Sequence, residues 1–226
     1  MQLQISRLKE YITHKILAKG YFISSFKQNQ ERQDFMRFLA TVYQKINCQI
    51  TYLDAINLKH FMKYAQNIKG DIVEVGVYNG ASALILAKLK HDKTLYLFDT
   101  FEGVPDKLTV RDTHKVGQYK AAYKDVEELF YHYARVYIHK GIFPQQTSKH
   151  IPNKTKFALV NIDVDIENSA KDCLNYFYPK MTKHGVIIVH DYSIVKSVRF
   201  VVNKFLEDKP EFLIETNSTP IIIIKQ

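Results

Sequence analysis

The chain is poor in the residues and runs that mark several protein classes. It has two cysteines in 226 residues, Cys48 and Cys173, and neither stands in a CxxC or Cys/His spacing. Two distant cysteines provide neither a disulfide framework nor a zinc site. The longest aliphatic runs, VIIV at 186–189 and IIII at 221–224, are strand length and far short of the roughly 18 residues of a membrane span. We therefore expect buried or half-buried thiols and no transmembrane helix.

The first residues also lack the features of a secretory signal. Arg7, Lys9 and Lys15 are spaced through them, and an apolar core with a small-residue cleavage site is missing. We therefore expect a cytoplasmic protein. A length of 226 residues suits one α/β domain with an N-terminal extension, and 46% hydrophobic and 24% charged residues are ordinary for a soluble globular protein.

Acidic residues are the minority charge. With 32 Lys and Arg against 23 Asp and Glu, the formal net charge is +9. Such a balance favours an anionic partner, which leaves nucleic acid, a phosphorylated small molecule and an anionic membrane surface open. The lysines are scattered, and no RRM, KH or helix-turn-helix pattern gathers them. We expect no nucleic-acid partner and leave peripheral membrane contact open.

Residues 1–67 carry helical periods and no strand signal, so we expect a helical extension or lid there and a second domain over 68–226. Ile5, Leu8, Ile12 and Ile16 share one helical face. The favoured interpretation is a helix that docks on its own domain or on a second subunit, which predicts a homo-oligomer. A basic amphipathic helix on a membrane surface is the alternative.

Residues 71–226 alternate strand-like and helix-like segments, the pattern of a parallel sheet covered on both faces. The predicted strands are 71–77, 94–99, 135–141, 157–163 and 185–191, and the predicted helices are 82–90, 116–133, 168–181 and 194–207. The short turn NSTP between EFLIET and IIIIKQ predicts a C-terminal antiparallel hairpin. Five parallel strands plus this hairpin resemble the Rossmann-like, seven-stranded α/β sheet of class I methyltransferases.

The first predicted strand ends in a glycine turn, in the stretch DIVEVGVYNGASA. Ligands of open α/β sheets bind beyond the carboxyl ends of the strands, where the strand order reverses. Glu74, Gly76 and Gly80 follow an ExGxxxG spacing, and neither GxGxxG nor a P-loop is present. An acid at the strand end suits a cationic amino group, and Asp99 ends the second strand, where a carboxylate can accept hydrogen bonds from a ribose. This pair favours S-adenosylmethionine, although a turn kept small for packing is the alternative.

Acidic residues also follow the fourth and fifth strands. Asp163 lies in NIDVDIENSA, and His190 and Asp191 lie in VIIVHDYS. Because these strands are neighbours in the class I order, the three side chains can converge on one divalent cation. Such an ion would make an acceptor hydroxyl more acidic. His190 is alternatively a core histidine, and we favour a helix-capping role for Asp165 and Glu167.

Five blocks then carry a family resemblance over most of residues 70–206. They are GDIVEVGVYNGASA, LYLFDTFEGVP, HKGIFPQQT, NIDVDIENSAKDCLNYFYPKMTKHGVIIVHDYS and VKSVRFVVNKFL. In order and spacing they resemble the macrocin O-methyltransferase (TylF-type) family of sugar O-methyltransferases. The resemblance implies S-adenosylmethionine as cofactor and a divalent cation, Mg²⁺ or similar.

The resemblance also assigns the site residues. It implies a cofactor site of Glu74, Gly76, Gly80, Ser82 and Asp99, and a metal-binding and catalytic set of Asp163, His190 and Asp191. His190 stands where the family has an acid, so magnesium is less secure and a role as general base is the alternative. Glu167 and Asn168 also depart from the family pattern.

The function that the resemblance implies is methylation of a sugar hydroxyl, on a nucleotide sugar, a glycan or a glycosylated natural product. A phenolic or other small-molecule acceptor, and a catalytically idle cofactor-binding scaffold, are the alternatives. Residues 100–135 and those before 68 match the family least, so we expect them to overhang the crevice and choose the acceptor. Aromatic side chains there can stack on a sugar, although packing is favoured for them: Tyr119, Tyr123, Phe130, Tyr131 and Tyr133.

Overall fold

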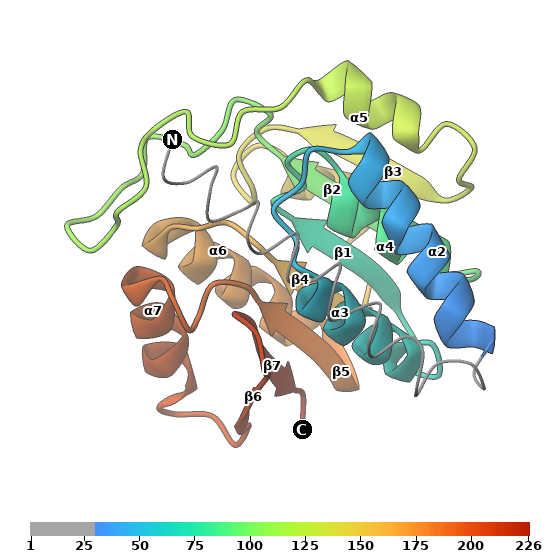
Figure 1. Ribbon diagram of the computed structural model, residues 1–226. Coiled ribbons are helices and arrows are strands. Elements are labelled where there is room, and N and C mark those ends of the chain that lie inside the picture. The colour runs from blue at the N-terminus through green and yellow to red at the C-terminus, as the bar shows by residue number, and fades with distance from the viewer. Residues whose placement is uncertain (1–29) are drawn as a thin grey trace. The chain divides into compact units, whose positions relative to one another are not determined.

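The computed structural model describes residues 30–226 (Figure 1). The chain divides into two compact units, and the unit that contains the sheet begins at Ile46. In the first unit the described residues form α2 (Gln30–Lys45), whose buried residues Phe35, Leu39 and Val42 follow helical spacing. The predicted helix over Ile5–Ile16 lies outside the described residues. Within residues 30–226, no helix is both long and apolar enough to cross a membrane.

In residues 46–226, seven strands form one mixed sheet in the order β3-β2-β1-β4-β5-β7-β6. The strands are β1 (Asp71–Val75), β2 (Leu95–Asp99), β3 (Val136–Lys140), β4 (Phe157–Ile162), β5 (Met181–Val189), β6 (Leu213–Glu215) and β7 (Ile221–Ile224). The first five run parallel, and β7 pairs antiparallel with both β5 and β6. The predicted fold class, with its C-terminal hairpin, is confirmed.

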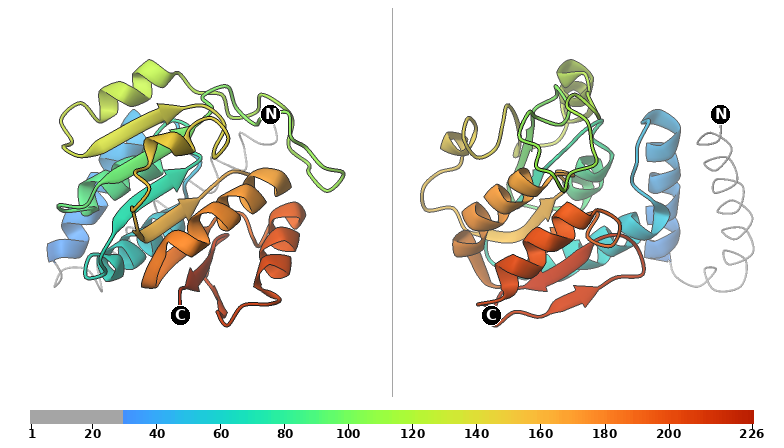
Figure 2. Two further views of the ribbon diagram at one scale, coloured as in Figure 1. Left: turned by 180° about the vertical axis from the view of Figure 1, so that it is seen from behind. Right: turned by 90° about the vertical axis from the view of Figure 1, so that its left-hand side faces the viewer.

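Helices cover both faces of this sheet (Figures 1 and 2). α3 (Tyr52–Ala65) packs against α4 (Ala81–Leu89) on one face, and α6 (Glu167–Phe177) packs against α7 (Lys196–Leu206) on the other. The central strands are therefore buried on both sides, which explains why β4 reads as a continuous run in which every residue is buried. Two 3₁₀ turns complete the elements, η1 (Ser148–His150) and η2 (Tyr178–Lys180).

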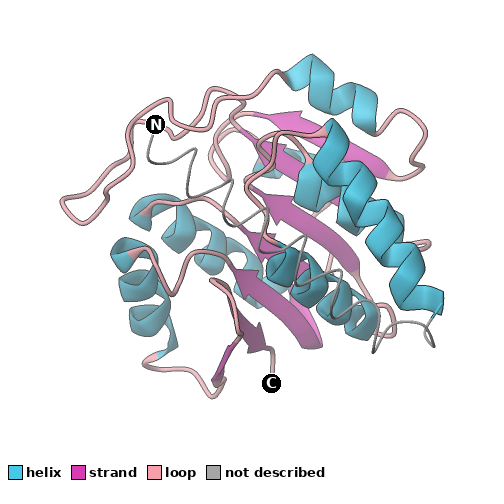
Figure 3. Ribbon diagram, viewed as in Figure 1, coloured by secondary structure: helices cyan, strands magenta, loops and turns pink. Residues whose placement is uncertain are grey.

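Two predicted helices are shorter in the structure. Of the predicted helix at 116–133, only α5 (Tyr123–Leu129) forms, and residues 100–122 make a long loop (Figure 3). The backbone N–H of Val104 donates a hydrogen bond of 2.8 Å to the Gln118 carbonyl, and Tyr119 has a φ of 63°. Neither feature is compatible with a right-handed helix, so the helix begins only after Tyr119. The predicted helix at 168–181 ends at Phe177, because Pro179 enters η2 and β5 already begins at Met181.

Asp112, on the long loop, caps α6 from outside the helix. Its Oδ1 accepts a hydrogen bond of 2.9 Å from the backbone N–H of Glu167, and its Oδ2 accepts one of 2.7 Å from Thr109. The N-cap residue of α6 itself, Ile166, has no capping side chain. The predicted capping role of Asp165 is therefore wrong. Glu167 does lie in the first turn of α6, where its charge complements the helix N-terminus as predicted, and its carboxylate accepts from the Thr109 hydroxyl at 2.8 Å.

We expect Asp112→Ala to lower the free energy of unfolding by about 1 kcal/mol, the usual effect of removing a helix cap. Asp106→Ala is the matched control, since Asp106 is an acid of the same loop that makes neither of these bonds. Urea unfolding of both variants measures the difference. Equal stability of the two variants would contradict the capping role.

Candidate active site

A cavity of about 350 Å³ opens beyond the carboxyl ends of the parallel strands. Its walls are the glycine turn after β1, the ends of β2, β4 and β5, residues 48–54 before and within α3, and part of the long loop. Six of the predicted site residues line it: Gly76, Ser82, Asp99, Asp163, His190 and Asp191. Glu74 and Gly80 do not, so the structure places these two behind the cavity wall.

The charge of the cavity is opposite to that of the chain. Five carboxylates line it, those of Asp54, Asp99, Asp163, Asp165 and Asp191, and no described lysine or arginine does. The net charge of +9 therefore lies elsewhere on the molecule. An acidic cavity selects cationic ligands, whereas the overall charge alone favoured an anionic partner.

Asp99 ties the glycine turn to the end of β2. Its Oδ2 accepts hydrogen bonds from the backbone N–H groups of Val77 and Tyr78 at 2.7 and 2.8 Å, and its Oδ1 accepts one from Phe101 at 2.6 Å. A carboxylate has about four acceptor positions, so these three bonds leave limited capacity for a ligand. Asp99 thus fixes the shape of the turn as well as lining the cavity.

The two glycines of the turn make room for protein atoms. A Cβ on Gly76, which has a φ of +91°, would lie 1.7 Å from the backbone oxygen of Asp163. A Cβ on Gly80 would lie 3.0 Å from Leu129 Cδ1, a side-chain tip of α5. The predicted alternative, a turn kept small for packing, therefore describes both glycines, and Gly76 sets how closely the turn approaches the end of β4.

A buried polar chain runs beneath the cavity across three strands. Asn161 Nδ2 donates to Glu74 Oε1 at 2.7 Å, and His190 Nε2 lies 3.1 Å from Asn161 Oδ1. Since the Asn161 amide donates to Glu74, its oxygen accepts from His190, which leaves His190 Nδ1 on the side of Asp163, 4.0 Å from Oδ2. Burial raises the pKa of Glu74 to about 8, and its Oε2 has no hydrogen-bond partner among the described residues.

Three carboxylates meet at the ends of β4 and β5. Ligand oxygens of Asp163, Asp165 and Asp191 all lie within 4.8 Å of one another. Asp165 and Asp191 both have a φ of 60°, which an aspartate tolerates better than most residues and which brings their side chains to this place. The structure thus joins Asp165, rather than His190, to the predicted pair Asp163 and Asp191.

Partial burial and mutual repulsion act on these acids. Loss of water and the charge of Asp191 raise the pKa of Asp163 well above its usual range. Loss of water and the charge of Asp163 do the same for the pKa of Asp165. Carboxylates held this close favour either a shared proton or a bound cation.

This chain matches the family described as Macrocin-O-methyltransferase (TylF) over residues 53–215. The chain belongs to the macrocin O-methyltransferase family. The predicted family is thereby confirmed, and the match runs from α3 to the end of β6, so it includes every strand of the sheet except β7.

Two curated proteins named as O-methyltransferases are similar to the chain. Demethyldecarbamoylnovobiocin O-methyltransferase of Streptomyces niveus is 25% identical over 157 residues, which are 62% of this chain and 59% of that protein. Mycinamicin III 3''-O-methyltransferase of Micromonospora griseorubida is 26% identical over 159 residues, 61% of this chain and 62% of that protein. The chain therefore spans about three-fifths of the length of these relatives.

Solved structures show the same fold. The O-methyltransferase NovP has a TM-score of 0.68 at 22% identity, over 76% of this chain and 79% of its own. The calicheamicin methyltransferase CalS11 has a TM-score of 0.65 at 16% identity, over 87% and 93%. An O-methyltransferase from Bacillus cereus, solved in complex with SAH, has a TM-score of 0.60 at 12% identity, over 95% and 97%.

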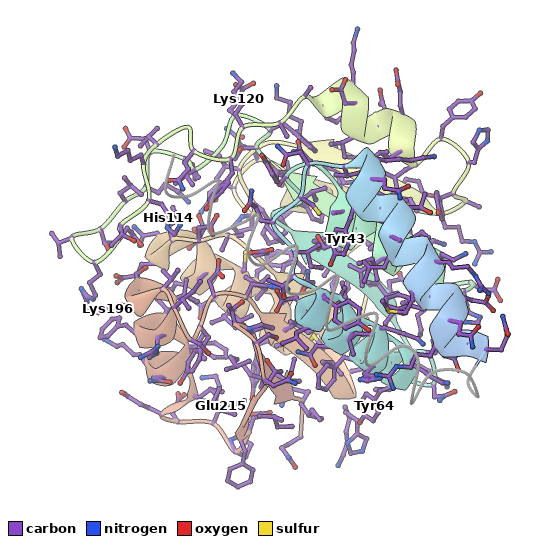
Figure 4. The ribbon with its side chains drawn as sticks, viewed as in Figure 1. Tyr43, Tyr64, His114, Lys120, Lys196 and Glu215 are labelled. Carbon is purple, nitrogen blue, oxygen red and sulfur yellow. The ribbon has the colours of Figure 1, made fainter. Side chains whose placement is uncertain are left out.

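The cavity also contains residues that the sequence reasoning missed. His114 comes from the long loop (Figure 4), and its Nε2 lies 3.9 Å from Asp165 Oδ1. Asp54 comes from the first turn of α3. The spacing of Thr51 and Asp54 is a recognisable capping box, but its position 17 residues before β1 gave no signal of a place in the cavity.

The predicted aromatic residues separate into cavity and packing roles. Tyr119 lines the cavity and lies edge-on to Tyr78, with ring centroids 5.7 Å apart. Tyr123 packs against Phe101 at 5.2 Å, and Phe130 is buried. Tyr131 is 84% exposed. Tyr133 lies by Phe130, with ring centroids 6.1 Å apart, so Tyr119 is the one of the five predicted aromatics that lines the cavity.

Proposed function

We propose that this protein is an S-adenosylmethionine-dependent O-methyltransferase that methylates a hydroxyl of a sugar, with help from a divalent cation. The observation that carries the proposal is the acidic cavity of a basic chain, placed at the carboxyl ends of a class I methyltransferase sheet. Family membership supports it, as do relatives named as O-methyltransferases of mycinamicin III and of a rhamnosyl-tetracenomycin.

The residues of the cavity fit S-adenosylmethionine, which supplies a transferable methyl group on a sulfonium cation. Gly76, Ser82 and Asp99 line the cavity and are proposed to contact it, with Asp99 nearest the ribose. Glu74 and Gly80, which lie behind the wall, are proposed to support the turn from within. Five lining carboxylates favour a cationic ligand over a neutral one.

The carboxylate cluster fits a divalent cation of the Mg²⁺ type, since hard cations prefer oxygen ligands. Asp163, Asp165 and Asp191 would hold the ion, which would make the acceptor hydroxyl more acidic. His190 would support this cluster rather than complete it, because its Nε2 is engaged by Asn161 and its Nδ1 faces Asp163. Asp165 then supplies the carboxylate that His190 lacks.

The long loop and the segment before α3 are proposed to receive the acceptor. His114 and Tyr119 line the cavity from the loop, and Cys48 to Thr51 line it from the other segment. Together they would orient the acceptor hydroxyl towards the methyl group and exclude water. Action in the cytoplasm and self-association of the chain stay predictions.

The proposal is tested by mass spectrometry of sugar nucleotides and glycoconjugates from cells with and without the gene. We expect a sugar species that is heavier by one methyl substitution when the gene is present. Activity on catechols but on no sugar would favour a phenolic acceptor instead. Cofactor binding without a methylated product of either kind would favour a scaffold protein.

A further inference from the structure

Asp54 is an acid of the cavity wall that lies outside the carboxylate cluster, and the fold provides hydrogen bonds to one of its two oxygens. It occupies the third position of α3, inside the capping box that begins the helix. Its side chain is 5% exposed, and it lines the cavity. A carboxylate so placed is rare unless its oxygens are paired.

The capping box accounts for one of its two oxygens. Oδ2 accepts hydrogen bonds from the backbone N–H of Thr51 at 3.1 Å and from the Thr51 hydroxyl at 2.6 Å. Thr51 Oγ1 in turn accepts from the backbone N–H of Asp54 at 3.2 Å. These bonds fix the orientation of the carboxylate. Oδ1 is buried and has no hydrogen-bond partner among the described residues.

Asp54 and Asp99 lie at opposite ends of the cavity. α3 packs against α4, β4 and β5, whereas Asp99 ends β2 on the other side of β1. If the nucleoside lies by Asp99, as the proposed function requires, the opposite end of the ligand lies by Asp54.

That opposite end carries the amino group of the methionine moiety. An ammonium has three N–H donors and a positive charge, and it therefore satisfies a buried carboxylate oxygen better than a hydroxyl or a water does. Glu74, the acid predicted for this contact, is 0% exposed and does not line the cavity, whereas Asp54 does. Asp54 is the acid on this side of β1 that lines the cavity outside the carboxylate cluster.

We propose that Asp54 binds the ammonium group of the methionine end of the cofactor through Oδ1, while its Oδ2 holds the start of α3. The inference rests on the proposed function, because it presumes that an S-adenosyl compound occupies the cavity. It assigns to the segment before the sheet a role in recognising the cofactor. It also separates the two acids, with Asp54 in contact and Glu74 in support.

The test compares two ligands by isothermal titration calorimetry on the full-length chain. S-adenosylhomocysteine contains the amino-acid end, and methylthioadenosine is the same nucleoside thioether without it. We expect Asp54→Asn to weaken S-adenosylhomocysteine binding at least about tenfold, because a charge-assisted hydrogen bond is lost. The affinity for methylthioadenosine should change by less than about twofold.

Asp71→Asn is the matched control, because Asp71 is an acid at the start of β1 that accepts a backbone hydrogen bond of 3.1 Å from Thr94 and does not line the cavity. It should keep the wild-type ratio of the two affinities. A measurement on the wild-type chain guards against misfolding of the variant. There, S-adenosylhomocysteine should bind at least about tenfold more tightly than deamino-S-adenosylhomocysteine, the same molecule without the amino group.

Three outcomes would overturn the inference. One is unchanged S-adenosylhomocysteine affinity in Asp54→Asn, and another is an equal loss for both ligands. The third is a wild-type chain that binds the analogue lacking the amino group as tightly as S-adenosylhomocysteine. A wild-type chain that binds neither nucleoside would overturn the proposed function, and this inference with it.

Discussion

Asp163→Asn and Asp191→Asn are each expected to lower kcat by at least about 100-fold, a loss of roughly 2.7 kcal/mol in transition-state stabilisation. Both acids belong to the carboxylate cluster, whose ligand oxygens lie within 4.8 Å of one another. Removing one charge would weaken the hold on the proposed divalent cation and leave the acceptor hydroxyl a poorer nucleophile. Chelation with EDTA should abolish turnover of the wild-type enzyme in the same way.

Binding of S-adenosylhomocysteine should persist in both variants and under EDTA, because the proposed contacts of Gly76, Ser82 and Asp99 lie at β1, α4 and β2. Asp172→Asn is the control, since Asp172 lies on α6 outside the cluster and pairs with Lys107 at 2.9 Å. Its kcat should stay within about twofold of wild type. Full turnover in EDTA, with wild-type rates for both Asn variants, would remove the cation from the mechanism.

Asp165→Asn distinguishes the cluster seen in the structure from the set predicted from sequence. If Asp165 is the third ligand, the Asp165→Asn variant should lose activity as Asp163→Asn does. If His190 is the third ligand, Asp165→Asn should instead resemble the Asp172→Asn control. Metal titration of the variants, followed by calorimetry, gives a second readout that does not depend on the acceptor.

Gly76→Ala is expected to destabilise the fold by about 3 kcal/mol or more, because an added methyl group meets backbone and not a flexible side chain. Its Cβ would lie 1.7 Å from the backbone oxygen of Asp163 and 2.6 Å from the carbonyl carbon, at a φ of +91°. Relieving this overlap would push the glycine turn away from the end of β4. Binding of S-adenosylhomocysteine should fall together with the thermal midpoint.

Gly80→Ala provides the comparison within the same turn. Its φ of +86° carries a similar backbone cost, but its Cβ would meet the tip of Leu129 at 3.0 Å, which can move. We expect a loss of about 1–2 kcal/mol for this variant. Chemical unfolding of the two proteins ranks them, and a Gly76→Ala chain as stable as Gly80→Ala would contradict the close approach of the turn to β4.

The sheet could be predicted from sequence because its strands are buried on both faces. FALV at 157–160 and VIIV at 186–189 are continuous apolar runs, which is the pattern of strands covered on both faces. The order of the strands followed from the class I plan, and with it the adjacency of Asp163 and Asp191. The burial pattern and the class I strand order were therefore enough to predict the sheet.

The loop after β2 could not be predicted, because its conformation depends on contacts distant in sequence. Thr109 and Glu167 are 58 residues apart, and Asp112 binds a backbone N–H 55 residues away. Local helical spacing of tyrosines at 116–133 was therefore a poor guide. The same limit hid His114, whose place by Asp165 exists only once the loop is docked on α6.

The third member of the carboxylate cluster was missed for a local reason. An acid just before a helix is usually a cap, so Asp165 was given that role. The left-handed backbone at Asp165 turns its side chain away from α6 and towards Asp191, and Asp112 takes over the cap. His190, which stands beside Asp191 in sequence, points instead into the buried chain with Asn161.

Transfer of an isotope-labelled methyl group from S-adenosylmethionine to purified sugar acceptors tests the central claim most directly. The purified chain would be incubated with Mg²⁺ and a panel of nucleotide sugars and glycosides, and label and S-adenosylhomocysteine would be counted together. We expect label in an ether on a sugar hydroxyl, with one S-adenosylhomocysteine formed for each methyl transferred. A chain that binds the cofactor but forms no S-adenosylhomocysteine with any sugar, while methylating a catechol, would contradict the account.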